Sequence, residues 1–370
     1  MKNTDTIRLR SIDLLRGAIM LLMAIDHVRV YSGMPAGGPD PAIFFTRWVT
    51  HFCVSGFVFF AGTSAFLYGR KLNDRAALSR YLFSRGLLLV LLELTLIRFC
   101  WTFNLDFHAF MLAGVIWMLG WCMVLLAALI RLPFHAIWIT GVVMIAVQQV
   151  FGLVPAQWTW WNFIYTVGEE GPSWINVLYV IVPWIGVMMT GYGFGRLLTL
   201  EPTRRNRLCR WIGLGATVVF LVVGYITTTH TKGNLPFLFR LLNQQKYPPS
   251  QLYLLMTLGP LIALVPFAEK ATGWLANVLQ TFGRVPLFYY ILHILLIHLL
   301  ALGLNLILYG NGHQEWYHTA PFAGVPKENR WGLPLLYLIF LIAEVILYLA
   351  CRWYGRYKSQ HPEQKWLKYI

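Results

Sequence analysis

Ten apolar segments, each close to the length that crosses a bilayer as an α-helix, dominate this sequence. Spanning the hydrocarbon core of about 30 Å takes roughly 20 apolar residues in helical form. The segments lie near 12–31, 48–69, 81–101, 109–130, 134–153, 175–198, 210–230, 251–269, 284–308 and 333–354. The chain is 58% hydrophobic and only 12% charged, about half the charged fraction of a soluble domain. We therefore predict an all-α, polytopic membrane protein of about ten transmembrane helices, in which residues 1–370 form a single domain.

The distribution of basic residues predicts the orientation of these helices. Cations gather at both ends of the chain and in alternate connections, at Arg8, Arg10, Arg70, Lys71, Arg75, Arg80, Arg85, Arg131, Arg196, Arg204, Arg205, Arg207, Arg210, Arg352, Arg356 and Lys358. The 154–174 connection has no Lys or Arg but carries Glu169 and Glu170. By the positive-inside rule, both termini are cytoplasmic. The net charge of +15 is then a topology signal that favours anionic lipid as a partner and argues against nucleic acid.

Metal and disulfide chemistry have no support in the sequence. The five cysteines are scattered, with no CxxC pair, and no HExxH, GxSxG or phosphate-binding glycine loop is present. The glycines at 191, 193 and 195 follow a predicted span and favour close helix packing. Such small-residue faces could join helices within one chain or between two, which leaves a homodimer open.

The first span carries ionisable residues at both ends. Arg16 and His27 are eleven residues apart, which on a helix is about three turns and roughly 16 Å of rise, so they face nearly the same direction. Ionisable groups inside a span usually line a cavity or pair with a partner. Taken singly, an interfacial Arg that snorkels and a His that packs helices explain each residue about as well. Asp13, Asp26 and Arg29 on the same helix favour a functional face.

Asp26 and His27 are the best candidates for catalysis. A neutral imidazole oriented by a carboxylate is a plausible general base near neutral pH. Adjacent residues on a helix point about 100° apart, so the partner of His27 is either Asp26 or an acid from another helix.

His51 begins the second span and should lie at the same outer level as His27, because the two spans are antiparallel. With Arg47 it could assist acid–base chemistry on a polar substrate. The alternative is a histidine that caps a helix and bonds to a carbonyl.

Two further spans contain polar residues. Glu93 lies deep in apolar sequence five residues before Arg98, where a structural ion pair with Arg98 or Arg16 is one reading and a site residue the other. His293 and His298 are also five apart and so point to different faces, which makes one histidine facing the cavity more plausible than both. We assign acceptor binding to Arg29, Arg47, Glu93 and His293.

Several segments resemble a known family of membrane acyltransferases. They are SIDLLRG…DHVR (11–29), THFCVSGFVFFAGTSAFLYGR (50–70), PWIGVMMTGYGFG (183–195) and FGRVPLFYYILHILLIHLLA (282–301). Arg16, ten residues, then His27 resembles the signature of transferases that O-acetylate surface polysaccharides. The fuller pattern resembles bacterial relatives of heparan-α-glucosaminide N-acetyltransferase.

The resemblance implies an acetyltransferase of the bacterial inner (cytoplasmic) membrane. Acetyl-CoA would bind from the cytoplasm, and its acetyl group would pass to the amine or hydroxyl of an extracytoplasmic sugar or envelope glycan. Arg16, Arg85 and Arg284 would hold the CoA phosphates, without any metal, since Arg pairs well with phosphate. His27 would act as base or acetyl carrier.

The chain departs from the lysosomal enzyme at one point. That enzyme places its proposed catalytic histidine in the loop after the first helix and has Asn where His27 stands, whereas residues 32–46 here contain no histidine. Either His27 or His51 has taken over the role.

Two other classes of function remain as alternatives. A transporter of a sugar or related metabolite could use the same ions as a proton-coupled site, but it would have no need to bind acetyl-CoA. A non-catalytic scaffold would leave the face of Arg16 and His27 without a purpose.

Overall fold

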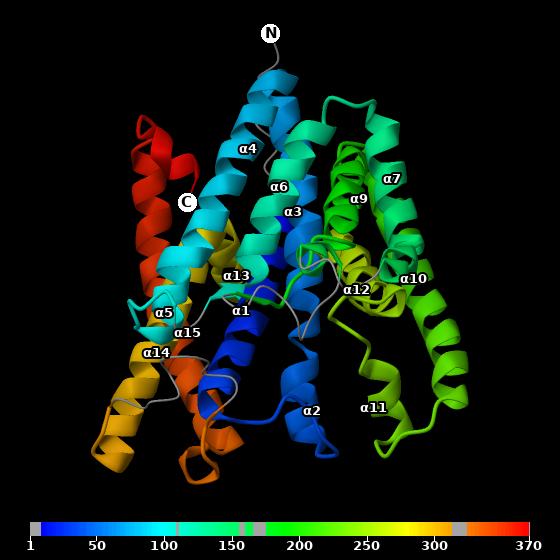
Figure 1. The fold of residues 1–370 in the computed structure, drawn as a ribbon. Helices are drawn as coiled ribbons and strands as arrows, with labels where there is room; N and C mark the ends of the chain where they lie inside the picture. Colours follow the sequence, from blue (N-terminus) through cyan, green and yellow to red (C-terminus); the bar gives the residue numbers. More distant parts are fainter. Residues whose placement is uncertain (1–8, 109–110, 155–159, 166–174, 313–323, 370) are drawn as a thin grey trace.

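The computed structural model describes residues 9–108, 111–154, 160–165, 175–312 and 324–369. These residues form a bundle of helices, most of them upright and side by side, with both ends of the chain at the same end of the bundle (Figure 1). The sheet of the described chain is one parallel pair of two-residue strands, β1 (Leu112–Ala113) and β2 (Asn176–Val177).

Helices account for most of the described residues. The longer ones are α1 (Arg10–Ser32), α3 (His51–Leu72), α4 (Arg75–Leu92), α10 (Pro202–His230), α12 (Gln251–Lys270), α14 (Pro286–Tyr309) and α15 (Leu333–Gln360). The shorter ones are α2 (Pro41–Trp48), α5 (Arg98–Thr102), α6 (Val115–Leu129), α7 (Phe134–Ala146), α8 (Trp161–Ile164), α9 (Trp184–Leu197), α11 (Phe237–Leu242) and α13 (Trp274–Arg284). A π-helical segment, Glu93–Ile97, joins α4 to α5, and 3-10 turns lie at Gln148–Leu153, Lys327–Asn329 and Lys365–Lys368.

The prediction of an all-α membrane protein is confirmed. Five described helices are long and apolar enough to cross a membrane, namely Pro41–Leu72 (α2 with α3), Pro202–His230, Gln251–Lys270, Pro286–Tyr309 and Leu333–Gln360. The apolar helices α6 and α7 are shorter. The total of ten spans and the cytoplasmic side therefore stay predictions.

The predicted spans at 109–130 and 175–198 are both shorter than expected, and in the first of them α6 begins only at Val115, after β1. Within 175–198 the helix α9 begins only at Trp184, because the residues before it are extended and pair with another segment. The amide of Asn176 donates to the carbonyl of Met111, and that of Leu178 to the carbonyl of Ala113. The parallel pairing satisfies backbone N–H and C=O groups that would otherwise form hydrogen bonds within a helix.

Glycines allow the central helices to approach closely. A Cβ on Gly191 would collide with the carbonyl of Phe59, and one on Gly62 with that of Met188, so α3 and α9 pack backbone to backbone. Gly17 and Gly283 do the same for α1 and α13. The expected packing role of the 191–195 glycines is confirmed, and it operates within one chain.

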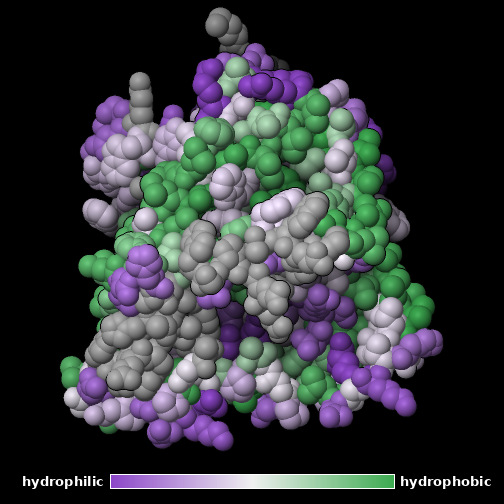
Figure 2. Space-filling model, viewed as in Figure 1, coloured by the Kyte–Doolittle hydropathy of each residue, from purple (hydrophilic) through white to green (hydrophobic). Residues whose placement is uncertain are grey.

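The outer surface is that of a membrane protein. Figure 2 shows hydrophobic side chains in a broad region of the face in view, with hydrophilic residues at both ends. The helix α10 lies at the periphery of the bundle and exposes Leu214, Val218 and Val222, each of which is more than half accessible. Apolar exposure of this kind suits contact with lipid.

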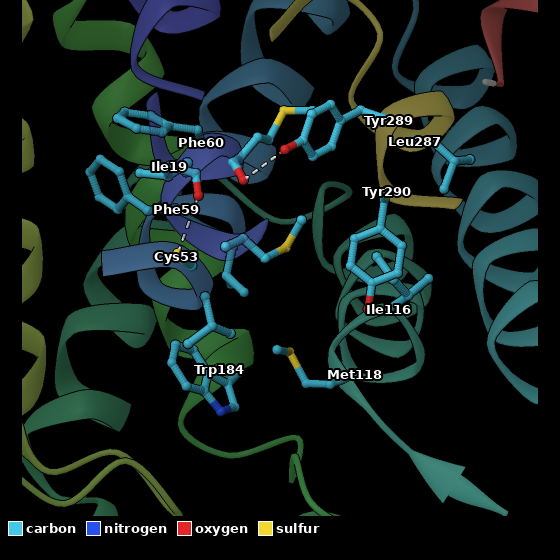
Figure 3. Packing of buried hydrophobic residues seen from close by; sticks show 14 of the residues in the cluster. Ile19, Cys53, Phe59, Phe60, Ile116, Met118, Trp184, Leu287, Tyr289 and Tyr290 are labelled. Carbon is cyan, nitrogen blue, oxygen red and sulfur yellow. Dashed lines mark hydrogen bonds between the residues drawn. The ribbon is translucent and has the colours of Figure 1, made fainter. Parts of the chain in front are cut away.

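The helix α1 lies in the core. Residues Ile19, Phe59 and Phe60, nearly fully buried, pack where α1 meets α3 (Figure 3). The Cys53 thiol donates to the carbonyl of Ile19 (3.2 Å), and the Tyr289 hydroxyl from α14 lies 3.3 Å from the carbonyl of Met20. Bonds to α1 from two neighbours fix the helix that carries Arg16 and His27.

Candidate active site

A cavity of about 670 Å³ runs beside the first half of α1. This volume falls within the usual range of small-molecule sites, about 300–1,000 Å³. Its lining includes six basic residues, Arg16, Lys71, Arg85, Arg284, Lys358 and Lys368, and one acidic residue, Asp13. Lys71 and Lys358 lie near the ends of α3 and α15, so this charged mouth is at the end of the bundle where the termini lie.

The deeper wall of this cavity is apolar. It is formed by side chains from four helices, among them Phe57, Leu89, Met123 and Leu287. A charged mouth above an apolar shaft suits a ligand with an anionic head and a neutral chain.

A second, smaller cavity of about 40 Å³ adjoins the first. Its lining includes Asp26, His27 and Lys246. Phe57, Val115 and Tyr290 line both cavities, so these three residues form the boundary between the two. The path from the basic mouth therefore leads along α1 toward His27.

His27 pairs with a histidine from another helix. Its Nδ1 lies 2.6 Å from Nε2 of His293 on α14, and the two rings stack with centroids 4.8 Å apart. His293 is fully buried, and its Nδ1 lies 3.1 Å from the carbonyl of Tyr289. The ring of Trp101 contacts that of His27 edge-on at 4.9 Å.

This geometry assigns the hydrogens of a neutral imidazole pair. A carbonyl oxygen only accepts, so Nδ1 of His293 carries its hydrogen and Nε2 of His293 accepts. The hydrogen between the rings then belongs to Nδ1 of His27, which leaves Nε2 of His27 with a free lone pair. Among the described residues, that nitrogen has no hydrogen-bond partner. A lone pair held this way is what a general base or a nucleophile needs.

Asp26 is bound to arginines rather than to His27. Its carboxylate accepts a hydrogen bond from Nε of Arg29 (2.9 Å), and Nε of Arg47 lies 3.8 Å away. Arg29 also donates to the carbonyl of Met34, and Arg47 to the hydroxyl of Thr50. No hydrogen bond joins Asp26 to His27, so the partner of His27 comes from another helix but is a histidine and not an acid.

The two remaining span histidines bond to backbone carbonyls. Nδ1 of His51 lies 3.0 Å from the carbonyl of Trp48, and His51 lines neither of the two cavities. Nδ1 of His298 lies 2.9 Å from the carbonyl of Cys100. The carbonyl partners of His51 lie at the end of α2, as in the helix-capping alternative. Neither His293 nor His298 lines either of the two cavities, so a histidine of this helix that faces the cavity stays a prediction, and His293 is the one that contacts His27.

Glu93 caps a helix. Its carboxylate accepts from the backbone amides of Ile116 (3.0 Å) and Trp117 (3.3 Å), which belong to the first turn of α6. Gly114 leaves room for that carboxylate, because a Cβ there would collide with it. The π-helical segment that begins at Glu93 thus ties α4 to the start of α6 beside both cavities.

The three arginines expected at the CoA site all line the larger cavity. Arg16 donates to the carbonyl of Phe60 (3.0 Å) and to the hydroxyl of Ser64. Arg85 donates to the carbonyl of Lys368 (2.9 Å) and so holds the C-terminal segment. Ser84 and Tyr369 add a contact between hydroxyls at 3.1 Å.

Sequence reasoning missed several lining residues. From the sequence, Lys71 and Lys358 served only to predict orientation, and Lys368 was not considered. All three lysines line the mouth of the larger cavity. Lys246 was also missed. It was detectable in principle, because a lysine in the 231–250 connection, which the sequence predicts to be an outer one, runs against the positive-inside trend.

A tight turn presents Lys246 to the smaller cavity. Lys246 and Pro249 form an isolated antiparallel bridge, and the amide of Ser250 donates to the carbonyl of Gln245 (2.9 Å). The ammonium lies over the rings of Tyr247 (5.2 Å) and Tyr179 (5.7 Å). Burial acts to raise the pKa of the Tyr247 phenol, but the charges of Lys246 and Arg47 outweigh it and bring that pKa below its ordinary value.

The described residues include no group of three or more His, Cys, Asp or Glu that could hold a metal ion.

Fold and site together define a multi-pass membrane protein with a buried histidine at the end of a cation-lined internal cavity. A family model described as heparan-alpha-glucosaminide N-acetyltransferase, catalytic, matches residues 8–231. The chain belongs to this family and is a membrane acetyltransferase. No curated protein matches the chain. The matched range contains Arg16, His27 and Glu93 but ends before Lys246 and His293.

Proposed function

We propose that this protein transfers an acetyl group from cytoplasmic acetyl-CoA to the amine or hydroxyl of a sugar on the outer side of the membrane. The observation that carries the proposal is that two adjoining cavities lead from a mouth lined by six cations to His27. A transporter would need a path for its substrate, but nothing in transport calls for a cationic mouth followed by an apolar shaft.

The donor site follows from the chemistry of CoA. Its phosphates would be held at the mouth by Arg16 and Arg284, together with the lysines at 71, 358 and 368, while Arg85 holds the C-terminal segment in place. The pantetheine arm, which carries no charge, would follow the apolar wall. Its thioester would then reach the boundary at Phe57, Val115 and Tyr290, next to His27.

His27 acts as the general base in the reaction we propose. Its Nε2 takes the proton from the acceptor amine or hydroxyl as that atom attacks the thioester carbonyl. The tetrahedral intermediate collapses with cleavage of the C–S bond, and the proton passes from His27 to the departing sulfur. His293 is a positioning residue, because its hydrogen bond fixes the tautomer and ring orientation of His27.

The acceptor approaches from the side opposite the basic mouth. Both termini are then cytoplasmic, in agreement with the positive-inside rule, and the protein belongs in a bacterial inner membrane as one domain surrounded by lipid. We assign Arg29 and Arg47 to holding Asp26, His51 to capping the last carbonyls of α2, and Glu93 to capping α6.

The test uses purified protein in detergent with acetyl-CoA and glucosamine. We expect CoA binding by calorimetry, release of free thiol, and acetylated sugar as product. His27→Ala should reduce turnover about 10²- to 10⁴-fold, the usual contribution of a general acid–base group, with CoA affinity preserved.

Two outcomes would contradict the proposal. Absence of CoA binding by folded protein would favour the transporter. Acid quenching of the reaction before acceptor is added should leave no acetyl group on the protein, and an acetyl group on His27 would show that the histidine is a carrier and not a base.

A further inference from the structure

We propose that the ammonium of Lys246 stabilises the negative charge that develops on the acetyl carbonyl oxygen during transfer. This role rests on the proposed acetyl transfer, and it adds a catalytic residue to it. Lys246 lies outside the matched family range and comes from the turn before α12.

The first argument is burial without an anion. Lys246 is only 8% exposed, yet its ammonium has no hydrogen bond or ion pair with any residue that the structure describes. The two tyrosine rings beneath it offset part of the cost of desolvation. A buried ammonium that no described anion contacts directly, with the carboxylate of Asp26 acting on it only from beyond ion-pair distance, is normally expensive. Its retention indicates a site prepared for an anion.

The second argument is the local balance of charge. Arg29 and Arg47 surround the single carboxylate of Asp26, and Lys246 is not within ion-pair distance of it. Among the residues that the structure describes, three cations and one anion thus meet in this half of the site. The surplus positive charge acts on the cavity that His27 lines.

The third argument is size. The cavity shared by His27 and Lys246 measures about 40 Å³. One water needs about 10–15 Å³ by this measure, so the space holds roughly three non-hydrogen atoms, which is the number in an acetyl group. A carboxylated or phosphorylated sugar ring does not fit there, which favours the oxyanion over an anionic group of the acceptor as the partner of Lys246.

The chemistry follows from this placement. When the acceptor atom attacks, the carbonyl π electrons move to oxygen, and the ammonium stabilises that oxyanion more strongly than it does the neutral thioester. The electrons return to the carbonyl as the C–S bond breaks. A preorganised donor of this kind, in a site shielded from water, is worth about 10²–10³ in kcat.

The experiment compares the wild type with Lys246→Met, Lys246→Arg and the control Lys232→Met. Lys232 is exposed in the same outer connection and should have no effect. Two rates are measured as thiol release, one for transfer to glucosamine and one for slow hydrolysis of acetyl-CoA without acceptor, since both reactions form the oxyanion. Calorimetry with CoA reports donor binding, and thermal melting reports folding.

We expect Lys246→Met to lower both rates by 10²- to 10³-fold, with CoA affinity and melting temperature close to wild type, and Lys246→Arg to recover part of the loss. Unchanged hydrolysis with a raised KM for the acceptor would overturn the role, because Lys246 would then bind the acceptor. Loss of rate in proportion to CoA affinity or stability would also overturn it. A wild type that binds CoA but releases no thiol would refute the proposed acetyl transfer itself, and with it this role.

Discussion

Nδ1 of His27 and Nε2 of His293 lie 2.6 Å apart, although 266 residues separate them in the chain. The carbonyl of Tyr289 holds the other nitrogen of His293, so the direction of the hydrogen bond between the rings is determined. An imidazole thus does for His27 what a carboxylate does in many catalytic pairs, without placing a negative charge beside the attacking group.

Removal of the hydrogen bond that His27 donates to His293 should lower activity without affecting donor binding. We expect His293→Phe to reduce kcat at least about 10- to 100-fold, the loss found when a group that orients a metal-binding histidine is removed, because the tautomer of His27 is no longer fixed. CoA affinity should remain within about twofold. The matched control is His298→Phe, which removes the bond to Cys100 and should lower the melting temperature rather than kcat per folded molecule. Equal kcat in both variants would exclude the positioning role.

Arg16→Ala should weaken CoA binding more than it slows saturated turnover. Arg16 lines the cavity mouth, and each charge-assisted hydrogen bond to a phosphate contributes about 1.5–3 kcal/mol, which is roughly 10- to 100-fold in Kd. Arg131→Ala, at an exposed site outside the cavity, serves as the control. Calorimetry with CoA measures the effect, and an unchanged Kd would remove Arg16 from the donor site.

Deletion of residues 361–370 should raise the KM for acetyl-CoA several-fold. The deletion removes Lys368 from the mouth and the carbonyl to which Arg85 donates. Because the lost interaction is electrostatic, the difference between full-length and truncated protein should shrink at high salt. The single substitution Lys368→Gln tests the side chain alone. A truncated protein with unchanged KM would show that the C-terminal segment takes no part in binding.

Glu93→Gln should cost stability more than activity. The glutamine keeps one oxygen that can accept from the first turn of α6 but replaces the other with a buried NH2 group that needs an acceptor of its own, and such changes at a helix cap cost about 1 kcal/mol. Thermal melting in detergent, combined with kcat per folded molecule, measures both effects. A stable but inactive variant would instead make Glu93 a residue of the site.

Local sequence was sufficient for much of the fold and part of the site. Most of the ten predicted segments fall closely on helices, because an apolar run of this length has few alternatives in a bilayer. The spans at 109–130 and 175–198 both begin late, since the pairing of Asn176 with Leu112 depends on two segments far apart in the chain. Arg16 and His27 could be placed on one face from spacing alone, and Arg16 lines the larger cavity while His27 lines the smaller one that adjoins it.

Only the tertiary structure decided the partners of those residues. A helix repeats every 3.6 residues, so directions along one helix can be read from the chain, but the rotation of one helix against another is set by packing. That packing places His293 in hydrogen-bond contact with His27 and Arg47 near the carboxylate of Asp26. It also places Lys246 in the lining of the cavity that His27 lines. The sequence determined that a cation and an imidazole share a face of α1, and the packed bundle determined which groups from the other helices and connections meet them there.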